Sequence, residues 1–493
     1  MITAKVRCAL GAGAILRATA LVTALALLCA GIAAPRTAHA ATIVIVNQNA
    51  PGIGFNDPTP AQPVGDNPGV TLGEQHLLAF QYAAGIWAAS LVSEVPIRIG
   101  AAFLPLECNA TGAVLGAAGA NQVISDFPAA PLPGTWYPGA LAGKLAGIDF
   151  VQPDVPHIIA RFNSRLGLFP DCVPGLTFYL GLDRNSGARI DLVTTLLHEI
   201  AHGLGFQTFT DDETGEQLQG KPSVWDFFLL DNQRERLWVQ LSNAERAASA
   251  TSWRGLSWNG AYVTAAVPGV LAPASLLTIS GAAAGSAARN YAVGDASFGP
   301  SIGTAPVSGQ LMPVVDQASG AGLACTPLNA LNALAVRGNV AFVDRGSCEF
   351  TVKARNVQAA GALGMLLADN VASEAAGDVA SLPGVGADIA IPSARITLAD
   401  GLVLKAALQD RSRTRSGVVA RLASDPARLA GADARQRMLM YTPGTYSPGS
   451  SVSHYTTEAT PNLLMEPSIN EDLRHAVAPP RDLTLPLLRD IGW

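Results

Sequence analysis

Charged side chains are scarce in this 493-residue chain, since Asp, Glu, Lys and Arg make up only 14% of it. The net charge is −6 and we find no basic cluster, which excludes the electrostatic footprint of a nucleic-acid-binding protein. Apolar residues reach 49%, and the abundant Gly and Pro residues are dispersed. We therefore predict a globular, loop-rich protein without low-complexity tracts, long enough for about three domains.

Beyond residue 40, the chain lacks any apolar run long enough to cross a bilayer. Residues 1–40 are typical of an export signal: Lys5, Arg7 and Arg17 precede an apolar stretch at 18–34, and a small-x-small cleavage site ends at Ala40. An uncleaved membrane anchor is the alternative. We expect a secreted, extracellular or periplasmic protein with no stable membrane anchor after cleavage.

Cysteine is also rare, and cleavage at Ala40 leaves four of the six residues: Cys108, Cys172, Cys325 and Cys348. None has the CxxC spacing of a metal or redox site, and an even number in an exported chain favours disulfides. Four cysteines allow three connectivities; sequence proximity suggests Cys108–Cys172 and Cys325–Cys348. Free buried thiols are the alternative.

Of only seven histidines, two stand four residues apart in the segment HEIAHGLG, which spans 198–205. Positions four apart share a helix face, so His198 and His202 can bind one ion with Glu199 beside it. In zinc hydrolases such a glutamate takes a proton from zinc-bound water and passes it to the leaving amine. Two ordinary core histidines are the alternative, but the preceding apolar run and the turn at Gly205 favour a metal site.

A catalytic zinc takes three protein ligands and one water, so a third ligand is needed. Thr208 stands where the commonest long form of the motif has a histidine. Asp211 and Asp212 are acceptable ligand types, although their DDETGE segment is typical of a solvated acidic loop. The histidines that follow the helix are His454 and His475.

The order of motifs along the chain decides between them. HEIAHGLGF, a long insertion, SVSHY, LLMEP and finally LTLPLLRDIGW resemble the leishmanolysin family of metzincin metallopeptidases. The resemblance implies that His198, His202 and His454 bind one catalytic Zn²⁺, that Glu199 is the general base, and that Met465 forms a methionine turn beneath the metal. It leaves His475 without a counterpart, and we expect that residue at the surface.

This chain departs from the family pattern in three respects. The insertion between Gly205 and His454 is much longer, at about 250 residues, and Tyr455 replaces an expected tryptophan. No propeptide with an inhibitory cysteine follows the signal, which argues against latency by a cysteine switch. A simple core methionine is the alternative for Met465.

The insertion contains GNVAFVDRGSCEF at 338–350, then AAGA at 359–362 and MLL at 365–367. This pattern resembles the protease-associated (PA) domain, with strands expected at 340–344 and 365–368 and a helix at 351–360 between them. Such domains usually lack catalytic groups. A role in substrate access or docking and a passive structural insert are equally compatible with the sequence.

Together these features predict an α+β fold: a split zincin or metzincin catalytic domain with an inserted α/β PA domain. The expected order is signal 1–40, catalytic part 41–271, PA domain 272–423 and catalytic part 424–493. Periodicity predicts strands at 41–46, 95–103 and 177–182 and helices at 71–93 and 190–204. The predicted function is that of a secreted zinc endopeptidase acting on protein or peptide substrates. The alternative is an inactive exported binding or adhesion protein. The oligomeric state does not follow from the sequence.

Overall fold

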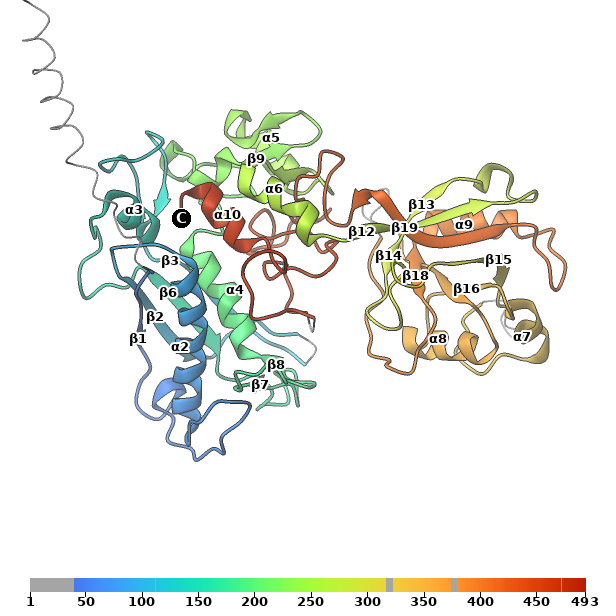
Figure 1. The fold of residues 1–493 in the computed structure, drawn as a ribbon, viewed down its shortest axis with the longest axis horizontal. Coiled ribbons are helices and arrows are strands. Elements are labelled where there is room, and N and C mark those ends of the chain that lie inside the picture. The colour runs from blue at the N-terminus through green and yellow to red at the C-terminus, as the bar shows by residue number, and fades with distance from the viewer. Residues whose placement is uncertain (1–39, 111, 316–321, 374–378, 471) are drawn as a thin grey trace, which may run out of the picture.

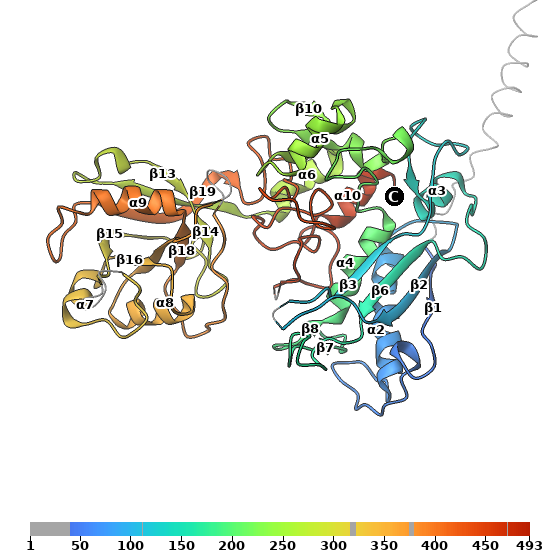
Figure 2. The same ribbon diagram turned by 180° about the vertical axis from the view of Figure 1, so that it is seen from behind.

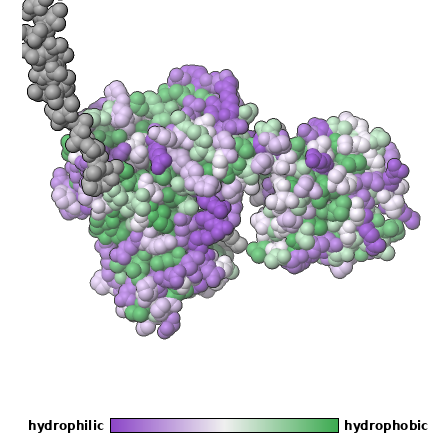
Figure 3. Space-filling view, in the orientation of Figure 1, coloured by the Kyte–Doolittle hydropathy of each residue, from purple (hydrophilic) through white to green (hydrophobic). Residues whose placement is uncertain are grey.

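The computed structural model describes residues 40–110, 112–315, 322–373, 379–470 and 472–493. The predicted export signal lies outside these residues except for Ala40. The chain forms two lobes, the larger from both ends of the described sequence and the smaller from its middle (Figure 1). A narrow waist joins them in the space-filling view (Figure 3). Among the described residues, no helix combines the length and the apolar character that a bilayer span requires.

The larger lobe is built on a four-stranded sheet with the order β1-β2-β6-β3. Two parallel pairings, β1 with β2 and β2 with β6, form one unit, and β3 pairs antiparallel with β6 at the edge. The elements in this first part are β1 (Ile43–Asn47), η1 (Gly54–Asn56), α2 (Leu72–Ser90), β2 (Ile97–Leu104), β3 (Gly116–Ala120), β4 (Val123–Ile124), β5 (Tyr137–Pro138), α3 (Gly139–Ala146), β6 (Ile158–Asn163), β7 (Phe178–Tyr179), β8 (Ile190–Asp191) and α4 (Leu192–Leu204).

Helices α2 and α4 pack against one another and against this sheet. In Figure 1, α2 lies in front of the sheet, and Figure 2 shows the sheet from its other face. The expected helix at 71–93 begins after Thr71, whose side chain accepts the N–H of Glu74 in a capping box. The expected helix at 190–204 begins two residues later, because Ile190 and Asp191 form strand β8.

The rest of the larger lobe consists of short elements before the insertion and one helix after it. They are η2 (Leu218–Gly220), η3 (Val224–Phe227), β9 (Leu229–Asp231), β10 (Arg236–Leu237), η4 (Trp238–Gln240), α5 (Asn243–Ala250), β11 (Leu256–Trp258), α6 (Ala261–Val270) and α10 (Thr484–Ile491). One buried core contains residues from both parts of the sequence, 41–271 and 432–491. The two parts therefore fold as one unit around the insertion.

The smaller lobe is a sheet with the order β13-β12-β19-β15-β16-β17-β18-β14 and with helices around it. Its two faces carry separate buried clusters. The expected strand–helix–strand pattern is present as β16, α8 and β17. The elements are β12 (Pro273–Ser280), η5 (Gly285–Ala287), β13 (Asn290–Ala292), β14 (Gly294–Asp295), β15 (Val307–Pro313), α7 (Ala330–Val336), β16 (Val340–Asp344), α8 (Phe350–Ala359), β17 (Gly364–Ala368), β18 (Ser393–Ile396), α9 (Leu398–Ala407) and β19 (Val419–Leu429).

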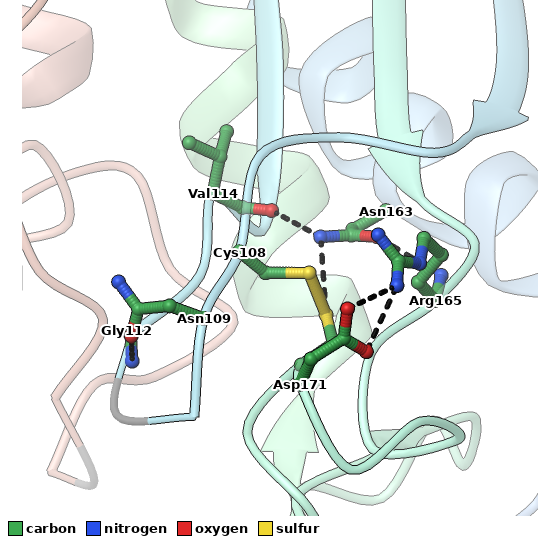
Figure 4. The surroundings of a disulfide bond; sticks show 8 residues. Cys108, Asn109, Gly112, Val114, Asn163, Arg165 and Asp171 are labelled. Atoms are coloured by element: carbon green, nitrogen blue, oxygen red, sulfur yellow. Dashed lines mark hydrogen bonds and ion pairs between the residues drawn. A yellow bond between two sulfur atoms is a disulfide. The ribbon is translucent and has the colours of Figure 1, made fainter.

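Both predicted disulfides, Cys108–Cys172 and Cys325–Cys348, are confirmed. The first joins the loop before β3 to the loop after β6 (Figure 4). Asn163, at the end of β6, donates its side-chain amide to the Val114 carbonyl at 3.0 Å. Arg165 and Asp171 form an ion pair across the second loop. The disulfide thus ties the two loops at the end of β3 where residue 116 lies. Such bridges are typical of proteins from oxidising compartments.

Candidate metal centre

Helix α4 is buried along its whole length, so its side chains are held by packing on every side. It begins at Asp191, whose carboxylate accepts the N–H of Thr194 at 2.8 Å. The apolar residues before His198 anchor it in the core, and the four-residue spacing directs His198 and His202 to the same side. His454 approaches this side from the other end of the larger lobe's sequence.

The structure brings these three histidines together. The Nε2 atoms of His198, His202 and His454 lie 3.2 Å from one another along all three edges of a triangle. Nitrogens bound at about 2.0–2.1 Å to one tetrahedral ion lie about 3.3–3.4 Å apart. The separation across 256 residues therefore matches the spacing of ligands on a single zinc ion. Among the described residues this is the one cluster of three His, Cys, Asp or Glu side chains with metal-ligand spacing.

The other ring nitrogen of each histidine meets a backbone carbonyl. His198 Nδ1 lies 2.7 Å from the Leu464 oxygen, His202 Nδ1 lies 2.7 Å from the Phe206 oxygen, and His454 Nδ1 lies 2.9 Å from the Ser450 oxygen. A carbonyl only accepts hydrogen bonds, so each Nδ1 carries the proton and donates it. Each Nε2 consequently presents a lone pair to the centre of the triangle, as in metal sites whose outer contacts fix the tautomer.

This donor set fits a cation and fits little else. Burial lowers the pKa of His198 to about 4 and that of His202 to about 3, and it also lowers the pKa of His454. All three imidazoles are therefore neutral at pH 7, and their Nε2 atoms cannot hydrogen-bond to one another. Three converging lone pairs in a buried place repel each other, and a positive ion relieves that repulsion.

Glu199 lies beside the triangle and faces the edge strand β3. Burial raises the pKa of its carboxyl group to about 8, while the backbone N–H of Ala118 donates to that group and opposes the rise. A nearby cation also lowers the pKa of a carboxyl group. A Cβ at position 116 would lie 3.1 Å from Glu199 Cγ, so Gly116 lets the strand approach this side chain closely. The carboxylate is thus held against the sheet edge, on the helix that carries His198 and His202.

Gly205 makes the contact at His202 possible. It ends α4 with a φ of +121°, a conformation that residues with a Cβ rarely adopt. The turn brings the Phe206 carbonyl back over the helix end, where it accepts the proton of His202 Nδ1. A Cβ at position 205 would also lie 2.9 Å from the Pro138 ring. The chain therefore leaves the helix at Gly205 as the sequence predicts.

Met465 lies fully buried in a turn that contacts two of the three histidine segments. The preceding carbonyl, that of Leu464, accepts from His198 Nδ1. The carbonyl of Met465 itself accepts the N–H of Tyr455, the residue after His454, at 2.8 Å. The turn consequently fixes His198 and His454 relative to each other.

The carboxylates that follow α4 have partners elsewhere. Asp211, one of the two candidates from the sequence, accepts the N–H groups of Glu213 and Thr214. Asp212 accepts the hydroxyl of Tyr446 at 2.8 Å, and Asp226 accepts the hydroxyls of Thr208 and Thr210. Thr208 nevertheless lies close to the centre, because its N–H donates to Ser453, the neighbour of His454. The chain therefore runs close to His454 at Thr208, just before it continues toward the insertion.

The expectation that His475 is a surface residue is wrong. Its side chain is only 6% exposed and its Nε2 lies 3.0 Å from the carboxylate of Asp191, the residue that caps α4. It also contacts the ring of Tyr82. His475 lies outside the triangle and supports the start of the helix instead.

Sequence reasoning did not identify the edge strand β3 or the three carbonyls that orient the histidines. The strand reads GAAGA, which carries neither alternation nor β-branched residues. Backbone carbonyls leave no signal in a sequence, since every residue has one. The Gly205 turn was the one available indication that Phe206 returns to the helix.

Comparison with known proteins identifies the smaller lobe. A family model described as the PA domain matches residues 307–404. The chain contains a PA domain. The match covers strands β15 to β18 and most of α9, and it confirms that a PA domain is present within the long insertion. It does not extend to the three histidines. No curated protein matches this sequence.

Solved structures with partial similarity include three peptidases. They are an aminopeptidase from Aneurinibacillus sp. strain AM-1 (18% identity, 31% of both chains, TM-score 0.23), BSAP, a zinc aminopeptidase from Bacillus subtilis (19%, 33% of this chain and 36% of that chain, 0.21), and the subtilisin-like protease Apa1 from the Antarctic psychrotroph Pseudoalteromonas sp. AS-11 (18%, 31% and 34%, 0.22). The chain spans about a third of the length of each. The activities of those whole proteins are not transferred to this chain.

Proposed function

We propose that this protein is an exported zinc endopeptidase of the metzincin class, with a leishmanolysin-like order of motifs interrupted by the PA domain. One observation carries the proposal: three histidine Nε2 atoms lie 3.2 Å from one another, and a backbone carbonyl at each Nδ1 orients each ring. Glu199 lies on α4, the helix that provides two of these histidines. His198, His202 and His454 are the residues that would hold the ion. Met465 would form the methionine turn.

A zinc ion in such a site supplies Lewis-acid polarisation of a peptide carbonyl and acidifies water. The residues of the chain provide the remaining parts of the reaction. Glu199 accepts the proton of the attacking water as the C–O bond forms, and it delivers that proton to the amine nitrogen as the C–N bond breaks. Because the carboxyl group is buried, bulk water does not compete for the proton.

The edge strand β3 offers a place for the substrate backbone. Within the part of the chain that the structure describes, β3 pairs with β6 alone, so its other side forms the edge of the sheet. An extended peptide can add to such an edge by main-chain hydrogen bonds. Strand residues 116–120 are Gly and Ala only, which leaves room for substrate side chains of different sizes. A substrate bound in extended form along β3 would present an internal peptide bond, which is the mode of an endopeptidase.

The first experiment is hydrolysis of unfolded casein by the mature protein loaded with zinc. We expect fragments to form, a zinc chelator such as 1,10-phenanthroline to stop their formation, and added Zn²⁺ to restore it. Mass spectrometry of the fragments distinguishes internal cleavage from removal of terminal residues. Cleavage that ignores the chelator would reject a zinc mechanism. Tight zinc binding with no hydrolysis of any protein would favour an exported binding protein.

A further inference from the structure

The C-terminal segment 482–493 contacts all three parts of the chain that carry the metal centre. The Asp482 carboxylate accepts the N–H of Leu464 at 2.7 Å, on the turn below His198. The carbonyl of Leu483 accepts the hydroxyl of Tyr455, next to His454, at 3.0 Å. Trp493 donates its ring N–H to the carbonyl of Leu204 at the end of α4, at 2.7 Å. Figure 1 shows α10 above the end of α4.

Asp482 connects two of these segments, because its two carboxylate oxygens accept hydrogen bonds from different parts of the chain. One accepts the N–H of Thr484 at 2.7 Å and so fixes the start of α10. The other holds Leu464, whose own carbonyl accepts from His198 Nδ1. A short path of hydrogen bonds therefore runs from a buried carboxylate, through one residue of the turn, to the ring of His198.

The turn is buried, but its packing is incomplete on the side that faces Asp482. Leu464 and Asp482 both line a cavity of about 150 Å³, which also adjoins Arg474 and Arg481. A cavity of this size leaves room for backbone displacement that a packed core would prevent. The hydrogen bond from Leu464 to Asp482 restrains the turn across that space. A small shift of the Leu464 carbonyl would tilt the His198 ring and move its Nε2 away from the triangle.

We infer that Asp482 is a positioning residue for the metal centre: it sets the orientation of His198 through Leu464 and thereby tunes metal affinity. This inference rests on the proposed metal site but not on peptide hydrolysis. Asp482 touches neither the metal ligands nor a substrate.

The test is zinc binding by the full mature chain carrying Asp482→Asn. Asparagine keeps one oxygen, so its amide group must face one of the two N–H donors and lose that hydrogen bond. We expect zinc to bind about tenfold more weakly, at the lower end of the effect of groups that orient metal ligands. Zinc affinity is measured by competition with a chelating dye, and the ligand geometry by the visible spectrum of the Co²⁺-substituted protein.

Asp490→Asn is the matched control. Asp490 lies within α10, which Asp482 precedes, and it also accepts two backbone N–H groups, but these come from Tyr262 and Val263 of α6. We expect this variant to lose thermal stability and to keep wild-type zinc affinity and the wild-type Co²⁺ spectrum. A merely structural role for Asp482 predicts that both variants behave alike.

Asp482→Glu covers the case in which the asparagine variant does not fold. The charge is kept, and we expect the added methylene to move the carboxylate away from Leu464 into the adjoining cavity. Weaker zinc binding in this variant supports the inference. Wild-type zinc affinity and spectrum in both folded variants, Asp482→Asn and Asp482→Glu, would overturn the inference and leave the peptidase proposal intact. A wild-type protein that binds zinc but cleaves nothing would reject the peptidase proposal alone.

Discussion

Replacing Glu199 by glutamine is expected to abolish nearly all peptide hydrolysis while one zinc ion remains bound per chain. Glutamine has the shape of glutamate and can still accept the N–H of Ala118, so the edge strand keeps its contact. It cannot take a proton from water. Loss of general-base catalysis lowers kcat by about 10²–10⁴-fold. The three metal-binding nitrogens are untouched, so metal content measured by mass spectrometry stays at the wild-type value.

The control for Glu199→Gln is Glu107→Gln, which removes an exposed carboxylate from the loop before β3. That variant should hydrolyse a fluorogenic peptide at the wild-type rate. Substantial activity in Glu199→Gln, with a folded protein and full zinc content, would exclude Glu199 as the base. Loss of zinc in the same variant would show that Glu199 belongs to the ligand set instead.

Replacing His454 by alanine is expected to remove both zinc and activity. Two histidines on one helix turn then remain, and a zinc site with fewer than three protein ligands is poorly held. The loss in zinc affinity should exceed the about 10–100-fold effect of losing an outer hydrogen-bond partner. Dye competition measures the affinity and the peptide assay measures the activity. This variant tests whether the site is closed by a residue that lies beyond the PA domain.

His475→Ala is the control for His454→Ala. It shows whether the loss of zinc is specific to His454 or follows from removing any buried histidine downstream of α4. His475 contacts the Asp191 cap but lies outside the triangle, so its loss should lower stability and preserve zinc binding. Full zinc content and activity in His454→Ala would mean that the third ligand is another residue. The carboxylates of the loop at 211–216 would then be the next candidates.

Features that depend on side-chain pattern could be predicted from the sequence. The apolar run before His198, the HExxH spacing and Gly205 predict the helix, two of the three nitrogens and the turn. His454 could be proposed only from its motif context, because no local pattern relates it to a helix about 250 residues earlier. Its approach to within 3.2 Å depends on the core shared by residues 41–271 and 432–491.

Features that depend on backbone groups and tertiary contacts could not be predicted. Strand β3 forms because β6 offers its edge to a segment of Gly and Ala, not because that segment favours a strand. The burial of His475 arises from its pairing with Asp191, 284 residues away. Such a contact appears in neither local sequence, and the family pattern offers no counterpart for this histidine, so the sequence alone predicts a surface position.

The central claim is that one zinc ion is held by three histidines from two distant parts of the chain. Anomalous diffraction at the zinc absorption edge from crystals of the zinc-loaded protein tests it most directly. We expect one strong peak about 2.0–2.1 Å from the Nε2 atoms of His198, His202 and His454. The claim would be contradicted if a zinc-loaded crystal showed no peak there. It would also be contradicted if the peak lay within bonding distance of His198 and His202 but not of His454.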